Sequence, residues 1–146
     1  MLALTGGNLI DGTGGPPIPD ATVLVNDQGR IDAVGQRREI VLPPDCQVID
    51  ITGLTLLPGL IDCHDHLTSF GYDLMGRWGW VEPQSARVLR VAKVMEETLR
   101  SGYTAIRDCG WLDVGYKHAM EQGLIPGPRL QLATSPLSPI QGTANR

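Results

Sequence analysis

The order of the predicted elements after residue 57 constrains the fold of this chain more than any other feature. Short apolar runs alternate there with one long and one shorter stretch of helical periodicity. The pattern predicts strands at about 59–65, 104–109 and 128–134, and helices at about 83–101 and 114–122. Strands that alternate with helices in this way form βαβ units, which build a parallel sheet. We therefore predict an α/β fold for this part of the chain.

The longer predicted helix carries the clearest periodicity. Its apolar residues recur at steps of three and four between charged residues, and Gly102 follows its end. These apolar residues are Val88, Val91, Ala92, Met95 and Leu99. The first strand has a different character, because the run 55–62 is almost continuously apolar apart from Pro58 and Gly59. Such a run predicts a strand that is buried on both faces.

The first 57 residues are rich in Gly, Pro and short β-branched runs, and they predict short strands joined by turns. The predicted strands lie at 8–12, 21–25, 30–35 and 47–50. Residues 26–29 predict a hairpin loop, because Asn, Asp and Gly tolerate the positive φ that tight turns need. We therefore expect a small β domain at the amino terminus.

Composition is that of an ordinary globular chain, and it argues against several functions. The 146 residues are 42% hydrophobic and 19% charged, with a net charge of −4. The Lys and Arg residues are scattered and form no basic stripe, which argues against nucleic acid as a partner. The amino terminus has no basic region before a long apolar run, and no stretch reaches the length of a membrane span. We expect neither secretion nor membrane insertion.

The chain has three cysteines, Cys46, Cys63 and Cys109, which are widely spaced and form no C-x-x-C pair. An odd number at this spacing argues against a disulfide framework and against a cysteine zinc knuckle. We expect free thiols in a reducing, cytoplasmic setting, each cysteine acting as a small buried hydrophobic residue.

Two histidines, His64 and His66, lie at the end of the first predicted parallel strand. Side chains alternate along a strand, so these imidazoles would project from one face and could bind one metal ion. On spacing alone this signal is weak. Asp62 would share the same face, where its carboxylate would either orient a ligand or cap a turn. Alternation places Cys63 and Asp65 on the opposite face.

Several other polar and aromatic residues could have functional roles, but we expect structural roles for them. Arg107 and Asp108 fall at the end of the second strand, where a local ion pair or strand-end hydrogen bonding is favoured over substrate contact. His118 is expected to be a solvated helix residue. Trp111 lies in a loop on the substrate side, as do Trp78 and Trp80, and packing of these loops is the expected role.

The run 57–67, Leu-Pro-Gly-Leu-Ile-Asp-Cys-His-Asp-His-Leu, resembles the strand-one signature of the amidohydrolase superfamily. Residues 8–14 and 29–35 look like the small amino-terminal β-domain of the same enzymes. Residues 98–108 and 123–129 look like the subgroup related to imidazolonepropionase and the metal-dependent prolidases.

This resemblance implies a partial (β/α)8 TIM-type barrel of about three strands at 58–146. Residues 1–57 would form the amino-terminal part of a composite β-sandwich. His64 and His66 would hold a divalent metal, usually Zn²⁺, in a site of one or two ions. Iron, manganese and nickel also accept imidazole. Later strands of such enzymes add a lysine, two histidines and an aspartate, and the site hydrolyses carbon–nitrogen bonds of small-molecule amides, cyclic amides or dipeptides.

The sequence departs from this pattern after about residue 139, where a Gly-Gly-His element would be expected. At 146 residues it is also short of the roughly 250 residues of a complete barrel. We therefore expect a truncated chain that has no catalytic residue of its own, binds metal weakly and is inactive alone. A frameshift, an early stop and a gene-model fragment would each explain this. The alternative is a catalytically silent scaffold or binding protein, and a homo-oligomer is compatible with either function.

Overall fold

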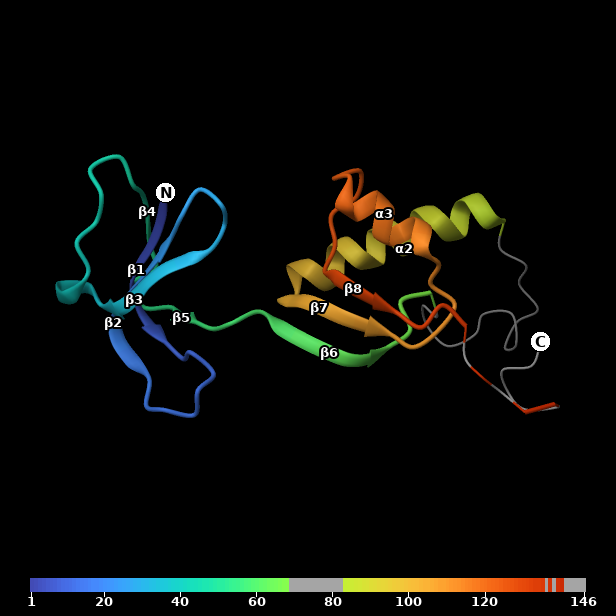
Figure 1. Cartoon of the computed structure of the whole chain (residues 1–146), viewed down its shortest axis with the longest axis horizontal. Coiled ribbons are helices and arrows are strands. Elements are labelled where there is room, and N and C mark those ends of the chain that lie inside the picture. Colours follow the sequence, from blue (N-terminus) through green and yellow to red (C-terminus); the bar gives the residue numbers. More distant parts are fainter. Residues whose placement is uncertain (69–82, 136, 138, 141–146) are drawn as a thin grey trace. The chain divides into compact units, whose positions relative to one another are not determined.

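Two units make up the chain, Met1–Pro58 and Gly59–Arg146, in the computed structural model (Figure 1). The structure describes residues 1–68, 83–135, 137, 139 and 140. Trp78, Trp80 and most of the tail after Ser135, which was predicted to be a loop, lie outside these described residues.

The first unit is built on one β-sheet. Strand order is β3-β2-β1-β4, and β5 also pairs with β1. The pairs β1–β2 and β2–β3 are antiparallel, whereas β4 and β5 run parallel to β1. The elements are β1 (Leu2–Leu9), β2 (Ile18–Val25), β3 (Ile31–Gln36), the 3₁₀ helix η1 (Arg37–Glu39), β4 (Gln47–Asp50) and β5 (Thr55–Leu56). The predicted hairpin at 26–29 is confirmed, since it joins β2 to β3.

The first strand lies earlier than the predicted 8–12, because β1 begins at Leu2. Its alternation is hidden in the sequence by Gly6 and Gly7, which have no side chain to mark a face. The pairing with β2 shifts register on either side of Gly7, and Gly6 has a φ of +92°. A Cβ at Gly7 would lie 2.8 Å from Ile51 Cδ1. Gly6 and Gly7 therefore allow an irregular strand to lie close to its neighbours, and they do not form a turn.

The second unit confirms the predicted order of strand, helix, strand, helix and strand. The three strands pair in parallel in the order β6-β7-β8. The elements are β6 (Leu60–Asp65), α2 (Gln84–Arg100), β7 (Tyr103–Asp108), α3 (Val114–Glu121) and β8 (Arg129–Leu132). Helix α2 ends as predicted, since Gly102, at a φ of +101°, donates its N–H to the carbonyl of Leu99.

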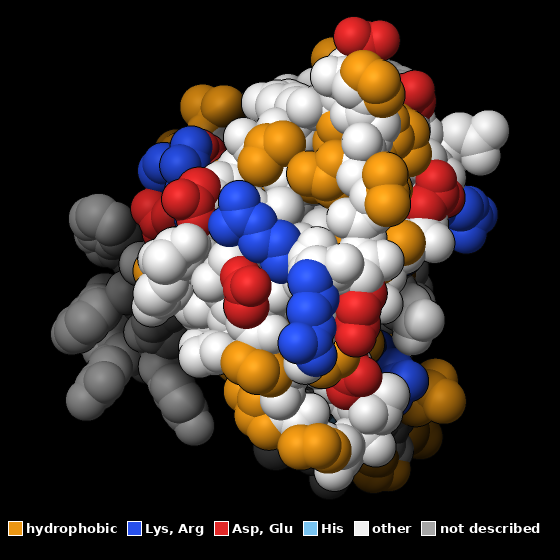
Figure 2. Space-filling model, turned by 90° about the vertical axis from the view of Figure 1, so that its left-hand side faces the viewer, with side chains coloured by type: hydrophobic (Ala, Val, Ile, Leu, Met, Phe, Trp, Pro, Cys, Tyr) orange, Lys and Arg blue, Asp and Glu red, His pale blue; other side chains and the backbone are white. Residues whose placement is uncertain are grey.

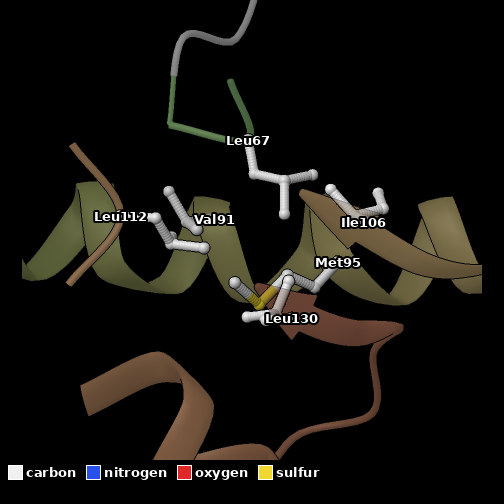
Figure 3. Close-up of a cluster of buried hydrophobic side chains, with 6 residues drawn as sticks. All are labelled: Leu67, Val91, Met95, Ile106, Leu112 and Leu130. Atoms are coloured by element: carbon white, nitrogen blue, oxygen red, sulfur yellow. The ribbon is translucent and has the colours of Figure 1, made fainter. Parts of the chain in front are cut away.

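The core of this unit lies between the sheet and its helices, which sit on one side of the strands in Figure 1. Val91 and Met95 from α2 are fully buried against Ile106 of β7 and Leu130 of β8. Figure 3 shows these side chains converging with those of Leu67 and Leu112. The apolar stripe predicted for the helix therefore builds this core, although Val88 at the start of α2 is 43% exposed.

The opposite face of the sheet is open among the described residues, which corrects the prediction of a first strand buried on both faces. Ile61 in β6 is 68% exposed, and Arg107, Arg129 and Gln131 are exposed as well. A parallel sheet buries both faces only where a layer covers each of them. The continuous apolar run thus predicts a surface that needs a partner layer, and no described element supplies one.

The surface carries charges of both signs. On the face drawn in Figure 2, Lys and Arg side chains intermingle with Asp and Glu and gather into no basic stripe. No helix among the described residues is long and apolar enough to cross a membrane.

Candidate metal centre

The two histidines of the motif lie beside each other at the carboxyl end of β6. Their ring centroids are 5.3 Å apart, and the ring planes meet edge to face at 75°. His64 is exposed and His66 is partly buried. The short strand therefore brings both rings to the same end of the sheet.

The pairing of β6 with β7 contains an extra residue between Asp62 and Asp65, an interval that includes His64. Asp62 pairs with Ile106 and Asp65 pairs with Asp108, so three steps on β6 match two steps on β7. Aligned residues on neighbouring strands share a face, so Asp62 and Asp65 both lie on the helix-covered side with Ile106. Leu67, two residues after Asp65, accordingly packs in the core.

This bulge corrects the expected position of Asp62. Strict alternation predicts that Asp62 shares a face with His64 and His66, but the alternation is interrupted between them. The Asp62 carboxylate instead accepts a hydrogen bond from the backbone N–H of His64 at 2.9 Å. Asp65 accepts one from the backbone N–H of His66 at 2.7 Å. This hydrogen bond is the local backbone cap, one of the two roles left open for Asp62, and the orientation of a metal ligand by Asp62 stays a prediction.

His66 has an unusual environment. Its Nδ1 atom is buried and has no hydrogen-bond partner among the described residues. Its ring lies against Trp111, with centroids 5.6 Å apart and planes tilted by 40°. Trp111 is still 49% exposed. The predicted role of Trp111 in loop packing is therefore incomplete, because its indole also contacts His66, a candidate metal ligand.

Asp108 supplies strand-end hydrogen bonding, which was one of its two expected structural roles. The side chain is fully buried. Oδ2 accepts from the backbone N–H of Leu67 at 2.8 Å, and Oδ1 accepts from that of Gly110 at 2.9 Å. The neighbouring Arg107 is exposed. No local sequence pattern predicts the contact with Leu67, since the two residues are 41 positions apart.

The residues present fit a metal ion as a partial set of ligands. Two adjacent imidazoles, one with a buried and unpartnered nitrogen, are suitable donors for a divalent ion. Within the part of the chain that the structure describes, no three His, Cys, Asp or Glu side chains cluster in a way that could hold a metal. His118 is exposed on α3, as expected for a solvated helix residue.

The cysteines add no ligand and no crosslink. All three are free, as predicted. Their expected burial is wrong, because Cys63 is exposed and both Cys46 and Cys109 are only partly buried. Cys63 belongs to β6, whose outer face is uncovered, so its exposure has the same origin as that of Ile61.

A pocket of about 770 Å³ lies beside the sheet but does not include the histidines. Strands β6, β7 and β8 contribute Cys63, Arg107 and Gln131 to it, and α3 contributes Lys117. We do not assign this pocket to the candidate metal centre, since neither His64 nor His66 lines it.

Residues 55–143 match the model of the amidohydrolase family. This region contains His64 and His66 and the strands β6, β7 and β8.

Individual relatives agree with this match. The chain is 48% identical over 54 residues to an imidazolonepropionase of Idiomarina loihiensis, an alignment that covers 37% of this chain and 13% of that enzyme. A dihydroorotase of Syntrophus aciditrophicus is 35% identical over 72 residues, which cover 49% of this chain and 16% of the relative.

Solved structures match over a longer part of the chain. A prolidase complexed with N-methylphosphonate-L-proline has a TM-score of 0.83 and 32% identity, and the match covers 97% of this chain and 33% of the prolidase. A molinate hydrolase has a TM-score of 0.78 and 32% identity, over 92% of this chain and 30% of that chain. The chain thus spans about a third of the length of these structures, and its alignments cover smaller shares of the relatives matched by sequence.

Proposed function

This chain belongs to the amidohydrolase family, and from that premise we propose that it supplies the first part of a metal-dependent hydrolase that acts on carbon–nitrogen bonds. In this proposal His64 and His66 are ligands of a divalent ion, with zinc the expected metal. The substrates would be small-molecule amides, cyclic amides or dipeptides. The names of the imidazolonepropionase, dihydroorotase and prolidase relatives support this range.

The observation that carries the proposal is the pair of imidazoles at the carboxyl end of β6. Their rings are adjacent, and His66 keeps a buried nitrogen without a hydrogen-bond partner. An unsatisfied buried nitrogen costs free energy, so a site that retains one is suited to a ligand that would satisfy it. A bound divalent ion would polarise the substrate carbonyl and lower the pKa of a water molecule.

We also propose a place for each unit in the complete architecture. The second unit would be the first part of a (β/α)8 barrel, and its open sheet face would be the lining of that barrel. The first unit would be the amino-terminal part of a β-sandwich. In the barrel fold, active sites lie at the carboxyl ends of the strands. The position of His64 and His66 at such an end supports this arrangement.

The third histidine of the chain provides a matched control for the metal proposal. We expect zinc titrated into the 146-residue chain in a calorimeter to bind more weakly than about 1 μM, because working zinc sites use three or four protein ligands. His64→Ala and His66→Ala should each abolish this binding, whereas His118→Ala should leave it unchanged. We expect no amide hydrolysis by the chain alone.

Each result separates the alternatives. Tight binding or measurable turnover would contradict the proposal that the chain holds only part of the site. Binding that His118→Ala removes, and that the other two variants retain, would overturn the assignment of ligands. Absence of any zinc binding would favour a catalytically silent scaffold or binding protein over an enzyme.

A further inference from the structure

The buried carboxylate of Asp108 joins two segments that carry the rings of the candidate centre. It is fully buried, and each of its two oxygens accepts one backbone N–H. Burial of a carboxylate is costly unless hydrogen bonds compensate it, and bonds to a charged acceptor are among the stronger ones in proteins. The two N–H groups that bind Asp108 are therefore held firmly.

The two N–H groups that bind Asp108 belong to residues next to His66 and Trp111. One belongs to Leu67, the residue directly after His66, and the other to Gly110, the residue directly before Trp111. Asp108 thus ties the chain that leaves β6 to the chain that leaves β7. The rings of His66 and Trp111 are in contact across this connection, with centroids 5.6 Å apart.

The backbone of Trp111 needs such support. Its φ is +71°, in the left-handed region that costs a residue with a side chain about 1 kcal/mol or more. Its N–H donates to the carbonyl of Thr134 at 2.9 Å, so a third segment also holds it. Burial does not explain the placement, since Trp111 is 49% exposed. The ring contact that Trp111 makes in this conformation is the one with His66.

We propose that Asp108 is a positioning residue, which holds His66 against Trp111 and thereby fixes the orientation of this imidazole toward a metal ion. The metal part of this inference rests on the proposed function above. Its geometric part, the dependence of the His66–Trp111 contact on Asp108, stands on the hydrogen bonds alone.

The test compares Asp108→Asn with a matched variant, Asp113→Asn. An asparagine at 108 keeps the size of the side chain but presents an NH₂ group to one of the two backbone N–H donors. Asp113 caps α3 by accepting from the N–H of Gly115 at 2.7 Å, and asparagine caps a helix equally well. Both changes remove one negative charge, but only the first disturbs the segments beside His66.

Two readouts on the 146-residue chain are informative. The chain has three histidines, so its NMR spectrum contains few imidazole signals. The aromatic ring of Trp111 should change the chemical shifts of the His66 imidazole, because the two rings are in contact. In Asp108→Asn the His66 signals should move toward the positions of an unstructured histidine, while those of His118 stay. Zinc affinity should fall by about tenfold, the size of effect typical when a residue that orients a ligand is lost. Asp113→Asn should change neither readout.

Unchanged His66 signals in a folded Asp108→Asn variant would overturn the proposal. If that variant does not fold, hydrogen exchange in the wild-type chain decides, because the amides of Leu67 and Gly110 should be protected and rapid exchange of either would contradict the proposal. Failure of the proposed function gives a different result, namely no zinc binding by the wild type. The imidazole signals then decide the role of Asp108 by themselves.

Discussion

At the scale of single residues, Gly59 explains why a glycine precedes the first parallel strand. A Cβ at this position would overlap Cγ2 and Oγ1 of Thr104, and would lie 2.7 Å from the Cβ of Thr104. No rotation of the Thr104 side chain moves its own Cβ, so the conflict cannot be relieved by a change of rotamer. Glycine is therefore required at the Pro58-Gly59 step by the close approach of β7, and the motif contains a packing residue as well as candidate ligands.

We expect Gly59→Ala to destabilise the second unit by about 1–3 kcal/mol, the usual cost of overpacking. All three tryptophans lie in this unit, so denaturation followed by tryptophan fluorescence reports on it. In a Thr104→Ala background the same change should cost less, because two of the three overlapping atoms are gone. Equal costs in both backgrounds would show that the two residues do not interact.

Residue-level prediction from the sequence succeeded where neighbours in the chain determine the outcome. The free cysteines and the solvated His118 follow from local patterns. The position of Asp62 did not follow, since a bulge depends on the partner strand. The contact of Asp108 with Leu67 joins residues that are distant in the chain, which no local pattern reveals. The metal role of His64 and His66 stays a prediction.

At the scale of elements, helix α2 shows how reliably a long periodic segment predicts a helix. It was predicted at 83–101 and is found at Gln84–Arg100, because its apolar face continues over several turns and Gly102 ends it. The reverse holds for β1, in which two glycines interrupt the pattern of faces. Elements were thus predictable to the extent that side chains mark their faces.

The buried face of α2 supports a prediction with an internal control. Met95→Ala should destabilise the second unit by about 2–5 kcal/mol, because it empties a fully buried position between the helix and the sheet. Leu89→Ala removes a side chain of similar size that is 73% exposed, and it should change stability by less than about 0.5 kcal/mol. Thermal or urea denaturation measures both. Similar losses would mean that α2 does not present this face to the core.

At the scale of the whole molecule, the uncovered face of the three-stranded sheet dominates the expected behaviour. Parallel sheets in known folds are covered on both faces. Here β6 and β8 are also edge strands within the described residues, and edges with unpaired backbone groups invite association. The sequence predicted the strands and their order, but not which face would remain open, because an apolar run is the same whether its partner layer is present or not.

We therefore expect the 146-residue chain to self-associate as its concentration rises. Ile61→Lys places a charge on the open face, where the isoleucine is 68% exposed, and should shift the population toward monomer. Val41→Lys adds the same charge at a position that is 91% exposed and outside the strands, and should have little effect. Sedimentation velocity over a range of concentrations distinguishes these cases. A wild-type chain that stays monomeric throughout would contradict the expectation.

The surplus residue in β6 has a consequence for the whole site. Counted strictly from Asp62, the period-two rule would aim both imidazoles at the helices, into the hydrocarbon that surrounds Leu67. The irregular pairing between Asp62 and Asp65 interrupts that alternation, so the strict rule does not hold for the two histidines. A variant that kept every residue but made the pairing of β6 with β7 regular would retain the motif letter for letter, yet its imidazoles would lie on the helix-covered face of the sheet.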